Sequence, residues 1–163
     1  MTRKAKIEDI AQVLAIYNAN IDAGTASFEE EPFTYEEGME WFLEHQGNYP
    51  LWVFESEGNI RGFATLSRYG HRRETAYRCA EVSIYVDQQA QGQGVGSRLM
   101  DTLIEEAKAL PKIDQLISLI TKGNQGSIAL HEKKGFRYMG ELTNVAQKYG
   151  HRLGLVFYQR NVE

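Results

Sequence analysis

"AEVSIYVDQQAQGQGVGSRLMDTLIEEA", residues 80–107, is the stretch that decides the fold. Its first residues alternate in character, with Val82, Ile84 and Val86 on one face, as in a half-buried β-strand. Farther on, apolar residues recur at helical spacing, at Leu99, Leu103, Ala107 and Leu110. Three glycines, at positions 92, 94 and 96, separate the two patterns. The stretch therefore predicts a strand, a glycine-rich loop and a helix in direct succession.

The glycine-rich loop is suited to holding an anion. A helix N-terminus presents unpaired N–H groups, and glycines let the backbone approach a ligand closely. A Walker loop is excluded because no lysine follows the glycines, and a dinucleotide fingerprint because Ser97 stands where its third glycine belongs. The loop matches the pattern Gln/Arg-x-x-Gly-x-Gly/Ala through Gln91, Gly94 and Gly96. The alternative is that these glycines only shape a tight turn.

Turn and periodicity signals divide the remaining chain into further elements. Strands are predicted at 2–6, 51–56, 60–69, 77–87, 115–120, 137–146 and 152–161. Helices are predicted from Glu8, from a capping box of Thr34 and Glu37, after the glycine loop, and over 124–136 with Gly135 as its stop. The order β-α-α-β-β-β-α-β-α-β-β joins antiparallel hairpins to a helical crossover. The expected fold class is α/β (α+β), in a single domain over 1–163, and not a doubly wound parallel sheet.

Composition argues against several classes of partner. The 163 residues carry a net charge of −4 and no long basic run, which disfavours nucleic acid and anionic membranes. No apolar run approaches the length of about 20 residues that a membrane span needs. The N-terminal "MTRKAKIEDI" lacks the apolar centre of a signal peptide, and Cys79 is the single cysteine. We expect a cytoplasmic protein without an internal disulfide, and no His/Cys spacing suggests a metal site.

The strand, loop and helix of residues 80–107 resemble the core motif of the GNAT acyltransferase superfamily. Some thirty residues later, "NQGSIALHEKKGF" resembles its second signature, Asn-x-x-Ser-x-x-x-Tyr/His-x-x-x-Gly-Phe. Four further segments, "IYNANI", "FEEEPF", "YRCAEVSIYV" and "QKYGHRL", resemble a narrower branch, the phosphinothricin and methionine sulfoximine N-acetyltransferases. The resemblance covers nearly the whole chain.

The resemblance implies a mixed sheet of about seven strands flanked by about four helices, with a splayed strand pair that binds acetyl-CoA. It implies that a main-chain N–H near Ile84 polarises the thioester carbonyl. The cofactor-binding residues that it implies are Val82, Ser83, Ile84, Tyr85, Val86, Gln91, Gly92, Gln93, Gly94, Val95, Gly96, Ser97, Asn124 and Ser127. Asn124 is alternatively the N-cap of a helix, and Ser127 an ordinary residue of its first turn.

Three residues are candidates for catalysis in this resemblance. Glu81 stands where the branch carries a glutamate, so it is the expected general base, directly or through a water. The alternative for Glu81 is an ion pair with a nearby arginine. His131 is expected to protonate the leaving thiolate, or else to be a packed or CoA-contacting histidine. Tyr85 is a second proton donor, with plain packing as its alternative.

The substrate side is expected to involve Arg73 and Arg78, because guanidinium groups bind carboxylates and phosphinates through two hydrogen bonds. A solvated charged loop is the alternative for Arg73 and for the neighbouring Arg72. Phe28 and Glu29 match a loop that closes over the substrate, or else a surface loop with one buried aromatic ring. Lys148 matches a turn near the active site, often at a subunit contact, for which a plain hairpin is the alternative.

Together these residues predict transfer of an acetyl group from acetyl-CoA to the α-amine of a small amino-acid analogue. Methionine sulfoximine, phosphinothricin and methionine sulfone are the analogues that the resemblance suggests, and a homodimer is the implied assembly. Cys79, Ala80, Arg152 and Gly154 depart from the branch near the substrate end. The alternatives are therefore another small amine, a protein N-terminus, or a non-catalytic module that binds CoA.

Overall fold

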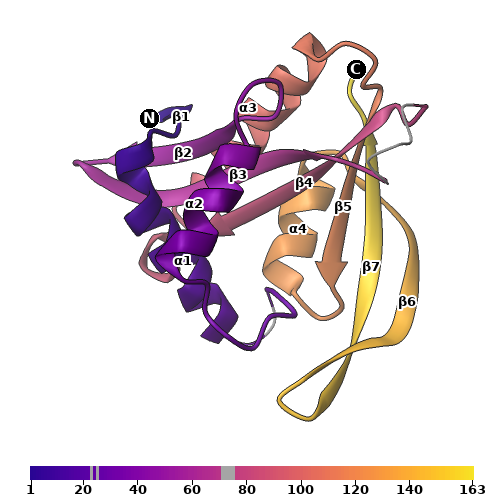
Figure 1. The fold of residues 1–163 in the computed structure, drawn as a ribbon. Helices are drawn as coiled ribbons and strands as arrows, with labels where there is room; N and C mark the ends of the chain where they lie inside the picture. The colour runs from indigo at the N-terminus through magenta and orange to yellow at the C-terminus, as the bar shows by residue number, and fades with distance from the viewer. Residues whose placement is uncertain (23, 25, 71–75) are drawn as a thin grey trace.

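The computed structural model describes residues 1–22, 24, 26–70 and 76–163 (Figure 1). Among them lie four α-helices and one mixed sheet of seven strands in the order β1-β2-β3-β4-β5-β7-β6. The strands are β1 Thr2–Lys4, β2 Leu51–Ser56, β3 Asn59–Arg68, β4 Cys79–Val86, β5 Gln115–Thr121, β6 Arg137–Lys148 and β7 His151–Asn161. The helices are α1 Ile10–Asp22, α2 Tyr35–Glu44, α3 Val95–Ala109 and α4 Gln125–Lys133, with 3₁₀ turns η1 Ile7–Asp9 and η2 Gln88–Ala90. The predicted class and element order are confirmed.

Helices cover both faces of the sheet (Figure 1). α1 and α2 pack over a core that includes Val13, Phe42 and Phe63. α3 packs on the opposite face through Leu99, and α4 joins that side through Ile128. Because strand residues alternate between faces, odd-numbered residues of β4 face α1 and α2, whereas even-numbered residues face α3. A residue of β4 therefore packs toward α1 and α2 or toward α3, according to whether its number is odd or even.

The β4–β5 pair is the one parallel pair among the described strands, and it is short. Its register joins Cys79 to Gln115, Ala80 to Leu116 and Glu81 to Ile117. Beyond Glu81, β4 continues along β3 and β5 continues along β7, but the two strands no longer pair with each other. This confirms the predicted splay, which leaves backbone groups of β4 without a sheet partner on one side.

Element ends follow the local signals, with two differences. The predicted capping box is present, since Thr34 Oγ1 accepts from the Glu37 N–H at 3.2 Å and Glu37 Oε2 accepts from the Thr34 N–H at 2.8 Å. The first helix begins as the 3₁₀ turn η1, and not directly at Glu8. The last hairpin is tighter than predicted, because β6 runs to Lys148 and only two residues, both with positive φ, form the turn.

Candidate active site

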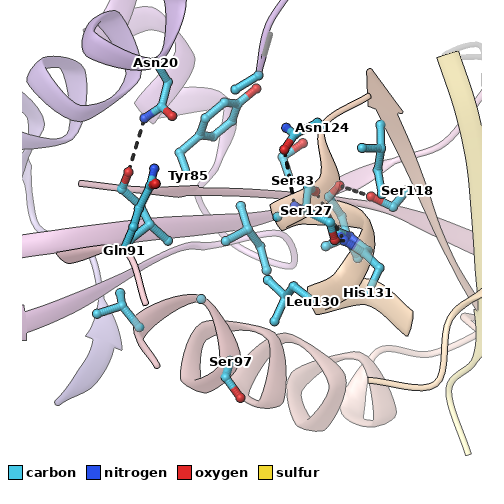
Figure 2. A pocket seen from close by; sticks show the side chains of 18 of the residues that line it. Asn20, Ser83, Tyr85, Gln91, Ser97, Ser118, Asn124, Ser127, Leu130 and His131 are labelled. Carbon is cyan, nitrogen blue, oxygen red and sulfur yellow. Dashed lines mark hydrogen bonds between the residues drawn. The ribbon is translucent and has the colours of Figure 1, made fainter. Parts of the chain in front are cut away.

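A cleft of about 800 Å³ opens where β4 and β5 separate (Figure 2). Its walls are the ends of these two strands, the glycine-rich loop, the first turn of α3, and α4. Every cofactor-binding residue predicted from the sequence lines the cleft except Gln93. The Gln93 side chain instead folds back, and its Nε2 donates to the Gln89 carbonyl at 3.0 Å. Two motifs that are distant in the sequence thus meet in one cavity.

The glycines of the loop serve two different purposes. Gly92 and Gly94 have φ of +75° and +82°, a region in which residues with a Cβ are strained. Gly94 is also the N-cap of α3 and has no side chain to occupy the first N–H groups of the helix, which stay available to an anion. A Cβ on Gly96 would lie 3.1 Å from Leu130 Cδ2, so glycine there lets α3 approach α4 closely.

The cleft suits the predicted acetyl-CoA. The α3 N-terminus offers N–H groups to a pyrophosphate, and the unpaired edge of β4 offers backbone groups to an extended arm that carries amides. Ser118 lies between the separating strands, where its Oγ donates to the Val82 carbonyl at 3.5 Å. The residues present therefore fit this ligand without a metal. Among the described residues, no cluster of three or more His, Cys, Asp or Glu could hold a metal ion.

Several cleft residues were not predicted from the sequence. They are Asn20, Ala26, Gln88, Ala90, Ser118, Leu119, Ile120, Thr121, Gly126, Leu130 and Lys133. The end of β5 could have been foreseen, since the partner of a splayed strand must form the opposite wall. Asn20 lies in the segment "IYNANI", but no spacing signal places it in the cleft, because it comes from α1. Its Nδ2 donates to the Ile16 carbonyl at 2.8 Å and to the Val86 carbonyl at 3.3 Å, which ties α1 to the end of β4 (Figure 2).

Glu81 is the last residue of β4 to pair with β5, immediately before the cleft-lining residues 82–86. It is half-buried, and this burial raises the pKa of its carboxyl above the ordinary value. Among the described residues it has neither an ion pair nor a hydrogen-bond partner, so the alternative of a pair with Arg78 is not seen. Arg72 and Arg73 lie outside the described residues. Glu81 does not itself line the cleft, and its role as general base stays a prediction.

Tyr85 lies on the same face of β4 as Glu81, two positions beyond Ser83, and lines the cleft. Its ring stacks on Phe63 at 5.2 Å and meets the edge of Tyr17 at 5.0 Å. Burial raises the pKa of the Tyr85 phenol, with a smaller contribution from the nearby Tyr17. The phenol is therefore neutral under ordinary conditions and keeps a proton to donate.

His131 is buried in α4, 3% exposed, and lines the cleft. Its Nδ1 lies 2.7 Å from the Ser127 carbonyl oxygen, which can only accept, so Nδ1 carries a hydrogen. Nε2 is buried and has no partner among the described residues. Burial lowers the pKa of the imidazole, so the neutral form is favoured. Nε2 is left as the ring atom that could exchange a proton with a ligand.

Asn124 is the N-cap of α4, as one of its two interpretations from the sequence has it, and its role in binding the cofactor stays a prediction. Its Oδ1 accepts from the Ser127 N–H at 3.3 Å as the N-cap of α4, and both residues line the cleft. The side chain that caps the N-terminus of α4 is therefore also part of the cleft wall.

Arg78 lies just before β4 and outside the cleft lining. Its Nε donates to Asp114 Oδ2 and its Nη2 donates to Asp114 Oδ1 at 3.0 Å. The guanidinium therefore already binds a carboxylate through two hydrogen bonds, but that carboxylate belongs to the chain itself. Arg78 would have to leave Asp114 to hold a substrate, and its predicted role stays a prediction.

The loop between α1 and α2 contains Phe28, which is half-buried, and Glu29, which is exposed. Lys148 anchors this loop from the other end of the chain. It is only 2% exposed, and its Nζ donates to the Ile21 carbonyl at 2.8 Å and to the Ser27 carbonyl at 3.0 Å. Lys148 thus positions the loop that carries the predicted substrate residues and does not line the cleft.

Replacing Lys148 with methionine should lower the free energy of unfolding by about 2 kcal/mol, because two buried carbonyl groups lose their donor. Methionine keeps most of the aliphatic stem, so the decrease in the free energy of unfolding measures the contribution of the ammonium group. Denaturant unfolding measures the change. Lys122, whose exposed ammonium pairs with Glu141, provides the control. Lys122→Met should leave stability unchanged, and equal stability of the two variants would contradict the anchoring role.

Within the part of the chain that the structure describes, no helix is both long and apolar enough to cross a membrane.

Comparison with known proteins identifies the family. Residues 13–136 match the acetyltransferase (GNAT) family. The L-methionine sulfoximine/L-methionine sulfone acetyltransferase of Pseudomonas aeruginosa is 34% identical, with 99% of this chain and 94% of that protein covered. An N-acetyltransferase structure from Staphylococcus aureus Mu50 has a TM-score of 0.93 at 42% identity and covers 100% of this chain and 98% of that one.

A structure of a GNAT phosphinothricin acetyltransferase from Sinorhizobium meliloti in complex with AcCoA has a TM-score of 0.91 at 34% identity. It covers 99% of this chain and 87% of that one. Fold, cleft and relatives agree with one another. The chain therefore belongs to the GNAT family of acetyltransferases, and it is an acetyl-CoA-dependent N-acetyltransferase.

Proposed function

We propose that this N-acetyltransferase acetylates the α-amine of a small amino-acid analogue such as methionine sulfoximine, phosphinothricin or methionine sulfone, with Glu81 as the general base. The position of Glu81 carries the proposal. A half-buried carboxyl with a raised pKa stands at the point where β4 separates from β5 and the cleft begins. The names of the Pseudomonas and Sinorhizobium relatives support the choice of substrates.

The proposed reaction combines proton transfers with the replacement of a C–S bond by a C–N bond. Glu81 takes a proton from the substrate ammonium, directly or through a water, and the freed amine attacks the carbonyl carbon of the thioester. A backbone N–H near Ile84 stabilises the negative charge on the carbonyl oxygen. The C–N bond forms, the C–S bond breaks, and the thiolate receives a proton from His131 or Tyr85. The nitrogen then loses its second proton, directly or through water, to the donor that protonated the thiolate. Both donor candidates line the cleft, which supports a role close to the sulfur.

Release of free thiol from acetyl-CoA, measured against a panel of amines, tests the substrate. We expect rapid turnover with methionine sulfoximine, methionine sulfone or phosphinothricin, and slow turnover with polyamines and with peptides bearing a free N-terminus. Preference for a peptide would favour acetylation of protein N-termini. Tight binding of acetyl-CoA without turnover on any amine would instead favour a non-catalytic CoA-binding module.

Two further expectations remain predictions from the sequence, namely the homodimer and the cytoplasmic location. Large apolar side chains exposed on the edge strand β6, among them Tyr138, Met139 and Leu142, are compatible with a second copy docking there. The sedimentation mass of the native chain checks the assembly.

A further inference from the structure

His45 and Ser67 form a polar pair beneath the sheet, outside the cleft described above. His45 follows the last turn of α2 and is 8% exposed. Its Nδ1 lies 3.0 Å from the Trp41 carbonyl oxygen, and its Nε2 lies 3.1 Å from Ser67 Oγ on β3. The Trp41 ring packs against the imidazole at 4.9 Å. Both ring nitrogens are thus engaged, and the ring is fixed in place.

These partners determine where the hydrogens lie. A carbonyl oxygen can only accept, so Nδ1 of His45 must carry the hydrogen that reaches Trp41. In a neutral imidazole the other nitrogen, Nε2, is then an acceptor. The Ser67 hydroxyl therefore donates to Nε2. Its single hydrogen is used, and the remaining lone pairs of Ser67 Oγ can only accept.

Ser67 lies directly opposite Glu81 in the antiparallel β3–β4 register. Residues in that relation point to the same face of a sheet, with Cβ atoms about 4.5 to 5.5 Å apart. That face is the one covered by α1 and α2, from which His45 reaches Ser67. The accept-only hydroxyl oxygen therefore faces the Glu81 carboxyl across the strand pair, and in the structure no hydrogen bond joins the two groups.

We propose that His45 and Ser67 are positioning residues for Glu81, which hold an accept-only oxygen opposite its carboxyl and so favour the protonated carboxyl formed when the substrate gives up its proton. The inference rests on the proposed role of Glu81 as general base. No bond beyond the transferred proton is involved. The proton stays on Glu81, whose O–H then has an acceptor, until product release returns it to water.

The two charge states of Glu81 meet this oxygen differently. The ionised carboxylate receives no hydrogen bond from Ser67, so it is poorly stabilised and more basic. The neutral acid donates to it, and a hydrogen bond to the neutral form raises a carboxyl pKa. Burial acts in the same direction at this position. A buried glutamate with such an acceptor has a higher carboxyl pKa than an exposed glutamate, so it can accept a proton closer to neutral pH.

Other titratable groups lie near Glu81, among them Cys79 on the same face of β4, whose thiol pKa is raised by burial. Tyr85 shares its strand face, and Tyr17 of α1 and Glu29 of the loop both act on Tyr85. The pKa values of Tyr17 and Tyr85 are raised by burial, so both phenols stay neutral across the acidic range. Glu29 is exposed. Among the described residues, no hydrogen bond, ion pair or ring contact joins these groups to the His45–Ser67 pair.

The pH dependence of kcat, measured with saturating substrates, tests the proposal. Ser67→Ala removes the oxygen, and His45→Asn keeps a donor for the Trp41 carbonyl while freeing the Ser67 hydroxyl to donate. Both should move the acidic limb of kcat to lower pH by about 0.5 to 1 unit and reduce kcat several-fold near neutral pH. Ser67→Thr retains the hydroxyl and should keep the native limb. Because neither residue lines the cleft, KM for acetyl-CoA should not change.

The possible results distinguish the positioning role of His45 and Ser67 from the proposed role of Glu81 as base. If the acidic limb of kcat is unchanged in both Ser67→Ala and His45→Asn, the positioning role is overturned. If Glu81→Gln is inactive in the same experiment, the proposed function still stands. An active Glu81→Gln would remove the proposed base itself. Ser67 is only half-buried, so Ser67→Ala should fold even where His45→Asn is destabilised. Using one amine throughout keeps the titration of the substrate common to all variants.

Discussion

Glu81→Gln should lower kcat by about 100- to 10 000-fold, which is the usual contribution of a general base. Glutamine has nearly the same shape as glutamate but cannot accept the proton of the substrate ammonium. KM for acetyl-CoA should be unaffected, because Glu81 precedes the cleft-lining residues 82–86 and is not one of them. Steady-state thiol release with saturating amine measures both quantities.

The pH dependence of kcat provides a second test of Glu81 as the base. Burial raises the pKa of Glu81, so the native rate should fall as the pH drops through a value above that of an ordinary glutamate, about 4.3, where the base becomes protonated. That acidic limb should disappear from the residual activity of Glu81→Gln. Glu40 on the exposed surface of α2 provides a control, and Glu40→Gln should retain full activity. A Glu81→Gln enzyme with most of its activity would exclude the carboxylate as base.

Gly94→Ala should raise KM for acetyl-CoA by about 10- to 100-fold, the equivalent of about 1.5 to 3 kcal/mol in lost hydrogen bonds to a charged group. Alanine at a φ of +82° is strained, and relief of that strain turns the first N–H groups of α3 away from their ligand. The added methyl group also reduces the close approach of the backbone. The expected loss is in binding, so kcat at saturating acetyl-CoA should change little.

A matched glycine separates strain from binding. Gly47, in the loop between α2 and β2, has a φ of +80°, and a Cβ built on either glycine meets nothing within 4 Å. Gly47→Ala and Gly94→Ala should therefore lose similar stability in thermal unfolding, about 1 to 2 kcal/mol. Only Gly94→Ala should weaken binding of acetyl-CoA, measured by calorimetry. If both variants bind acetyl-CoA as the native protein does, the glycine-rich loop does not hold the cofactor.

The elements of this protein follow from short-range signals, and the sequence therefore predicts them well. The alternation before Asp87, the glycines around Gly94 and the apolar spacing after it each act within a few residues. The capping box of Thr34 and Glu37 closes over three residues and is found as predicted. The sequence predicts a longer turn around Tyr149 than the structure has, because the ends of strands depend on cross-strand pairing.

Much of the cleft was also predictable, because the two motifs that line it are contiguous stretches. The functions of single side chains were less so. Arg78 is held by Asp114, 36 residues farther along, and Lys148 reaches the Ile21 carbonyl 127 residues away. The spacing of residues in the chain carries no record of such pairs, since they arise only when strand order and register are set.

What the sequence by itself determined is the order of elements, the anion-binding loop and the resemblance to GNAT acetyltransferases. What only the tertiary structure decided is which side chains share a face. Ser67 lies opposite Glu81 through one register of β3 on β4, and His45 reaches Ser67 through the packing of α2 on that sheet. A slip of one residue would turn each strand side chain to the other face. The surroundings of the proposed base therefore depend on long-range pairing.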